Sequence, residues 1–122
     1  MAVKSISATP NVSINFKRVA WLAMANGDTG TPLLPEHSAD YQDRSIQITG
    51  TFGAGGSVTI QGSNDGGVTW ATLTDPLGNP LTFTAAGIQR VTETTEQIRP
   101  NVTAGDGTTS LNAYLFMRGD FR

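Results

Sequence analysis

The segment Ser63–Trp70 constrains the fold of this chain more than any other part of its sequence. Gly66 and Gly67 tolerate positive φ, which the short loops of β-hairpins require. The side chains of Ser63 and Asp65 can accept hydrogen bonds from nearby backbone N–H groups and so fix the shape of the loop. The segment therefore predicts the corner of a β-hairpin.

The sequence on both sides of this corner alternates as strands do. Val68 and Trp70 lie two residues apart, so alternation puts both on one face of the outgoing strand, where we expect them to cover the core. Ser45–Phe52 and Val58–Gln61 also alternate between apolar and polar residues. We therefore expect a three-stranded meander over Ser45–Leu73, with Trp70 as the anchor of a small core.

Strand patterns continue through the rest of the chain. Arg18–Ala25 is an apolar run that fits a strand or a short helix. Pro100 within Ile98–Thr103 favours an edge strand or a strand start. In Leu111–Arg118 apolar residues occupy both faces, which favours a central strand or one whose outer face meets a partner. Short strands between glycine-rich turns predict an all-β fold, an antiparallel β-sandwich or a jelly-roll-like domain.

The chain divides into an extended N-terminal arm, residues 1–17, and a β-sandwich domain, residues 18–122. The arm is rich in Ser, Thr and Asn and has no helical periodicity. Ordering such a polar segment costs backbone entropy, and adding to a sheet edge, of its own domain or of a neighbour, offsets that cost. The arm is thus either an assembly element or a floppy tail.

Charge and cysteine content exclude several classes of partner and site. The net charge is −2 and no basic run occurs, so nothing in the charge pattern favours nucleic acid or a membrane as partner. The chain has no cysteine, which excludes disulfides and thiolate metal sites. It has neither a secretory signal nor a run of about 18 apolar residues, so we expect synthesis in the cytoplasm.

No residue pattern predicts catalysis. His37 is the only histidine, and its neighbours Ser38 and Asp40 lie on the same proline-flanked loop, where adjacent side chains rarely converge into a triad. The aspartates of the glycine-rich turns are expected there for turn chemistry alone. We therefore predict a protein that is not an enzyme, with no catalytic residue, cofactor or metal.

The corner segment also fits the Ser-x-Asp-x-Gly-x-Thr-Trp pattern of the Asp-box, which is best known from sialidases and related β-propellers. A propeller needs at least four blades of roughly 40–50 residues each, more than 122 residues supply. The motif occurs once here, and in those enzymes it is a structural hairpin remote from the catalytic site. This resemblance therefore implies a hairpin and not a glycosidase.

A second resemblance covers about half of the chain, from Ser57 to Arg118. Its strings are Val58–Gly67 with Trp70, Thr74–Asn79 and Ile98–Leu111. In these strings the chain resembles small β-rich virion proteins of tailed bacteriophages, among them head decoration or cement proteins. The resemblance implies a protein made in the host cytoplasm that sits on the capsid surface of the virion. There it would bind the major capsid protein and stabilise contacts between neighbouring capsid subunits.

We expect partner contacts on the arm, on the outward face of the last strand and at the C-terminus, through Val3, Ile6, Val12, Ile14, Phe16, Tyr114, Phe116 and Phe121. Self-association as a dimer or trimer is expected as well. Two alternatives stay open: another virion part, such as a tail-tube or head-completion protein, and a carbohydrate-binding or adhesin module. The second would use Trp21 or Trp70, although the strand patterns favour burial of both indoles.

Overall fold

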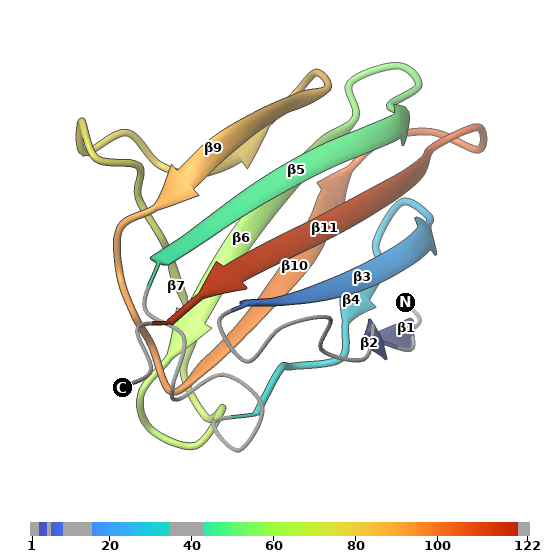
Figure 1. Ribbon diagram of the computed structural model, residues 1–122. Helices are drawn as coiled ribbons and strands as arrows, with labels where there is room; N and C mark the ends of the chain where they lie inside the picture. The colour runs from blue at the N-terminus through green and yellow to red at the C-terminus, as the bar shows by residue number, and fades with distance from the viewer. Residues whose placement is uncertain (1–2, 5, 9–15, 35–42, 120–122) are drawn as a thin grey trace.

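The protein folds into two β-sheets that face each other (Figure 1). The computed structural model describes residues 3–4, 6–8, 16–34 and 43–119, and these ranges contain strands and no helix. Sheet A comprises, in spatial order, β1 (Val3–Lys4), β4 (Thr29–Gly30), β10 (Gln97–Ala104), β6 (Ser57–Ser63) and β7 (Ala71–Thr72), with β8 (Thr82–Phe83) also paired to β6. Sheet B comprises β2 (Ile6–Ala8), β3 (Phe16–Met24), β11 (Ser110–Arg118), β5 (Asp43–Thr51) and β9 (Gly87–Val91). The predicted all-β class is confirmed.

Strands early in the chain pair with strands late in the chain. β3 pairs with β11, β4 with β10, β5 with β9 and β6 with β7, and all four pairs are antiparallel. The chain thus forms one long nested hairpin that is folded over between the two sheets. The Asp-box lies at the innermost end of this hairpin, between β6 and β7.

The core lies between the two sheets and is built by alternation along each long strand. Trp21 of β3 is 1% exposed, and its indole N–H donates a hydrogen bond of 2.8 Å to the carbonyl oxygen of Thr31. β11 is the central strand of sheet B, and the residues of its inward face have no exposed surface: Leu111, Ala113, Leu115 and Met117. Trp21 is therefore the large aromatic anchor of the core.

The predicted meander over Ser45–Leu73 is wrong in its first connection. β5 lies in sheet B and β6 in sheet A, so residues 52–56 cross from one sheet to the other. The crossing is tight, since a Cβ on Gly56 would lie 2.0 Å from the carbonyl oxygen of Phe52. In a sandwich both sheets bury one face, so alternation identifies the buried residues of a strand but not the sheet that it joins. The second connection, from β6 to β7, is a hairpin as predicted.

Pro100 lies in an inner strand, although proline favours an edge. β10 pairs along its length with β6 and, at Asn101, with the two-residue strand β4. On the β4 side the neighbour of the proline ring is Gly30, where a Cβ would lie 2.6 Å from Cδ of Pro100. A residue without a side chain thus makes room for a proline in the middle of the sheet.

The described part of the predicted arm pairs with the protein's own sheets. β1 runs parallel to β4, with Val3 opposite Thr29, and β2 runs antiparallel to β3, with Ile6 opposite Trp21. β3 begins at Phe16, two residues before the predicted start of the domain. The N-terminal strands therefore extend one edge of each sheet of their own chain, which is one of the two pairings that the sequence left open.

Replacing Trp21 with Ala should lower the free energy of unfolding by about 3–5 kcal/mol, because the change leaves a large cavity and removes the hydrogen bond to the carbonyl of Thr31. The measurement is urea denaturation followed by circular dichroism. Val68→Ala is the control, since Val68 is 82% exposed and its loss should change stability by less than about 0.5 kcal/mol. Equal losses in both variants would contradict the placement of the core.

Candidate functional site

The Asp-box corner uses its carboxylate to hold its own loop. One oxygen of Asp65 accepts hydrogen bonds from the Ser63 hydroxyl at 2.7 Å and from the backbone N–H groups of Thr69 and Val68 at 2.9 and 3.1 Å. These bonds, that of Thr69 first, lower the pKa of Asp65 to about 2. The hydroxyl oxygen of Ser63 in turn accepts from the N–H of Gly67 at 3.0 Å. Asp65 is thus a loop brace, held in its charged form.

Val68 and Trp70 do not cover the core, so this part of the hairpin prediction is wrong. Val68 points into solvent, and Trp70 is half-buried outside the core cluster, with the Arg99 guanidinium 4.0 Å from its ring centre. The indole N–H donates to the carbonyl oxygen of Gly67 at 3.0 Å. Gly66 and Gly67 both have positive φ, 79° and 87°. The loop continues through Trp70 and β7 begins only at Ala71, so strand alternation does not apply to these residues.

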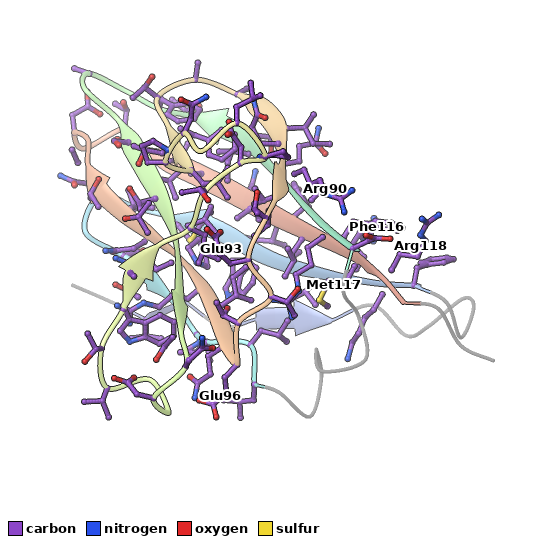
Figure 2. All side chains as sticks on the ribbon, turned by 90° about the vertical axis from the view of Figure 1, so that its left-hand side faces the viewer. Arg90, Glu93, Glu96, Phe116, Met117 and Arg118 are labelled. Atoms are coloured by element: carbon purple, nitrogen blue, oxygen red, sulfur yellow. The ribbon has the colours of Figure 1, made fainter. Side chains whose placement is uncertain are left out.

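A hollow of about 420 Å³ lies beside this corner, lined by residues that include Trp70, Asp65 and Glu93. The carboxylate of Glu93, on the connection between β9 and β10, accepts hydrogen bonds from the backbone N–H and the hydroxyl of Thr74. Glu96, on the same connection between β9 and β10, accepts from the N–H of Gly66 (Figure 2). Across the described ranges, no group of three or more His, Cys, Asp or Glu side chains could hold a metal ion. The corner is therefore a braced turn.

The outer face of sheet A is polar. Its cross-strand neighbours are hydrogen-bonded to each other: Thr59 with Thr82 at 3.2 Å, Arg99 with Gln61 at 2.9 Å and Thr29 with Asn101 at 3.1 Å. Such pairs satisfy each other within the sheet.

The outer face of sheet B carries large apolar side chains instead. Phe116 of β11 is 42% exposed and Ile88 of β9 is 61% exposed. The ring of Phe116 stacks on that of Phe16 from β3, with ring centres 5.5 Å apart. Tyr114, two residues before Phe116, lies on the same face and is partly exposed. The face is thus apolar at its centre, an uncommon feature for a surface that contacts only water.

Arginines flank this apolar centre. Asp43 of β5 accepts hydrogen bonds from Arg90 at 2.8 Å and from Arg118 at 3.3 Å, so one carboxylate serves two guanidinium groups. The bonds from Arg118 and then Arg90 lower the pKa of Asp43. Figure 2 shows Arg90, Phe116 and Arg118 together on the outer side of the sheet, whereas Met117 points inward.

Two adjoining hollows mark the outer face of sheet B. The first, of about 260 Å³, is lined by Asp43, Arg44, Ser45, Arg90, Phe116 and Arg118. The second, of about 450 Å³, is lined by Arg18, Ser45, Gln47, Ile88, Tyr114 and Phe116. Ser45 and Phe116 line both hollows. We call this surface, with its two hollows, the sheet-B face.

The sheet-B face unites three of the predicted partner-binding residues: Phe16, Tyr114 and Phe116. Val3 lies elsewhere, exposed on β1 at the edge of sheet A, and Ile6 lies in β2 at the edge of sheet B. Val12, Ile14, Phe121 and the loop histidine His37 lie outside the described residues. The sequence reasoning missed Ile88 and Arg90, because their place beside Phe116 depends on the pairing of β9 with β5, and no local pattern carries that pairing.

Comparison with known proteins gives no relative: no family model, no curated protein and no solved structure matches this chain. Within the described part of the chain, no helix is long and apolar enough to cross a membrane.

The melting temperature should fall as the pH is lowered from 5 to 2, and Asp65→Asn should reduce that fall. The folded-state pKa of Asp65 is lowered to about 2 from an ordinary value of 3.8, so its contribution is complete above pH 4 and is lost as the pH falls towards 2. Circular dichroism melts of the two proteins at pH 5 and pH 2 make the comparison. Asp106, whose pKa is also about 2, should preserve part of the pH dependence of the melting temperature in the variant. An unchanged pH dependence of the melting temperature in the variant would contradict the claim that the ionised Asp65 stabilises the loop.

Proposed function

We propose that this protein is a structural component of a bacteriophage virion, without enzymatic activity, that binds the outside of the head and stabilises contacts between major capsid subunits. The observation that carries the proposal is the contrast between the two outer faces of the sandwich. The outer face of sheet A pairs its polar groups with each other, whereas the sheet-B face presents Phe116, Ile88 and Tyr114 between arginines. Together with the resemblance to phage decoration proteins, this face supports a docking role.

The residues of the sheet-B face suit a protein interface. Aromatic residues and arginine contribute most to binding energy at such interfaces, above all near their centre. A docked area of roughly 800 Å² per partner is of standard size. On a capsid the repeated lattice and self-association as a dimer or trimer supply avidity, so each contact need only be modest. Sedimentation velocity of the free protein tests the self-association, and a monomer at all concentrations would contradict that part of the proposal.

The N-terminal arm has a smaller part in this proposal than the sequence alone favoured. β1 and β2 already pair with their own sheets, and a strand used in this way does not add to a neighbour. Removal of residues 2–15 would take an edge strand from each sheet and so lower the stability of the fold. A loss of capsid binding in that variant could therefore come from unfolding or from lost contacts. The sheet-B face offers a cleaner test.

The carbohydrate-binding alternative would rest on Trp70, since Trp21 is buried. The Arg99 guanidinium covers one side of the Trp70 ring, and the indole N–H bonds to Gly67. A sugar platform needs an open ring face with free polar groups around it. The observations at this corner therefore favour the docking proposal.

Phe116→Ser should weaken binding to undecorated heads of the encoding phage at least tenfold, because it removes the aromatic ring that lines both hollows. The measurement is co-sedimentation with purified heads over a range of protein concentrations. Leu77→Ser is the matched control, since Leu77 is 86% exposed in the loop between β7 and β8, and its binding should equal that of the wild type. The docking proposal fails if the wild type does not bind heads, or if Phe116→Ser binds as tightly as Leu77→Ser.

A further inference from the structure

The geometry of the sheet-B face points to the chemistry of its ligand. We propose that its two hollows bind an extended segment of the partner protein that carries an acidic side chain and an apolar side chain two residues apart. The inference rests on the proposed function, in which the partner is the major capsid protein. It adds the type of segment recognised and the role of each hollow.

The smaller hollow suits a carboxylate. Arg90 and Arg118 both direct a guanidinium group to Asp43, at 2.8 and 3.3 Å, so two positive charges share one negative charge. All three side chains are about half exposed or more, which leaves the guanidinium groups accessible from outside. A guanidinium group binds carboxylates with directed, charge-assisted hydrogen bonds. A second carboxylate, supplied by a partner, would balance the charge of this cluster.

The larger hollow suits an apolar side chain. Ile88, Tyr114 and Phe116 form its apolar wall, and Gln47 and Ser45 lie along its floor on β5. The hollow, of about 450 Å³, is open to solvent and offers room for a leucine or phenylalanine side chain. Arg18 at its border adds positive charge on the same side of the molecule.

The spacing of the hollows matches an extended chain. Asp43, Ser45 and Gln47 are successive outward residues of β5, and they lie opposite Arg118, Phe116 and Tyr114 of β11. On β5 the first hollow spans Asp43 to Ser45 and the second spans Ser45 to Gln47, so the two hollows are offset by two residues. Outward residues of a strand are about 7 Å apart, which is also the distance between side chains i and i+2 of an extended ligand. One segment lying along β5 and β11 can therefore fill both hollows.

Charge complementarity favours an acidic partner over a second copy that presents this same face. The residues that line the two hollows include four arginines and one aspartate, on a chain whose net charge is −2. Two such faces would repel each other, whereas a segment with a carboxylate is attracted, increasingly so at low salt.

The test is a titration of the full-length ¹⁵N-labelled protein with two synthetic peptides, acetyl-Ser-Asp-Thr-Leu-Ser-amide and the same peptide with Asn in place of Asp. We expect amide shift changes on β5, β9 and β11, and about tenfold weaker binding of the Asn peptide, as the loss of one charge-assisted contact predicts. Raising the salt concentration should weaken binding of the Asp peptide only.

Three variants separate the sheet-B face from general charge effects. Asp43→Asn should bind the Asp peptide several-fold more tightly, because both guanidinium groups then lose their resident carboxylate. The double change Arg90→Gln and Arg118→Gln should weaken its binding about tenfold, whereas Arg99→Gln, on sheet A, should leave it unchanged. Equal binding of the two peptides, shifts confined to other surfaces, or no shifts at saturating peptide would overturn the inference.

The same variants distinguish this inference from the proposed function. If heads bind wild type and the Arg90→Gln, Arg118→Gln protein equally well, the docking role stands and the acidic ligand is wrong. If the Asp peptide binds as described but heads do not, the ligand chemistry stands and the capsid partner is wrong.

Discussion

The pairing of β11 with β3 on one side and with β5 on the other is the interaction on which the rest of the structure depends. It joins the C-terminal strand to strands from the first half of the chain and so closes the nested hairpin. Because side chains alternate along β11, the same strand supplies the centre of the core and the centre of the outer surface. Leu115 and Met117 are buried between the sheets, while Tyr114 and Phe116 face outward. Folding and surface chemistry are therefore coupled through one strand.

The Asp-box has a supporting role in this arrangement. Its aspartate, serine and glycines shape the turn at the innermost end of the nested hairpin, where β6 reverses into β7. The hydrogen bonds that brace the loop also occupy the groups that a catalytic or sugar-binding site would need free. A motif known from enzymes here determines where the chain turns, and the cluster of Phe116, Ile88 and Tyr114 lies on the other sheet.

Much of the fold could be predicted from two-residue alternation. The errors arise because alternation identifies the buried face of a strand but not the sheet that the strand joins. The alternation within Leu111–Arg118 correctly predicted which residues of β11 share each face of the strand. The assignment of β5 and β6 to one meander failed because strands of both sheets show the same pattern of burial. Arg44 shares the inward face of β5 with Ile46 and is 2% exposed, and this burial lowers its pKa. The predicted strand began at Ser45 and so left Arg44 out.

The candidate site could be predicted only in part, since it is assembled from strands distant in sequence. Tyr114 and Phe116 stood out as apolar residues on the second face of one strand. Ile88 and Arg90 join them through the pairing of β9 with β5, and Phe16 through the pairing of β3 with β11. No single segment of the sequence contains both an arginine pair and the apolar wall beside it.

The measurement that tests the central claim most directly is cryo-electron microscopy of heads incubated with the purified protein. We predict added density on the outer shell, with β3, β11, β5 and β9 facing the major capsid protein and the β6–β7 corner turned away from it. Density attached through the β6–β7 corner or through the outer face of sheet A, or no added density, would contradict the account.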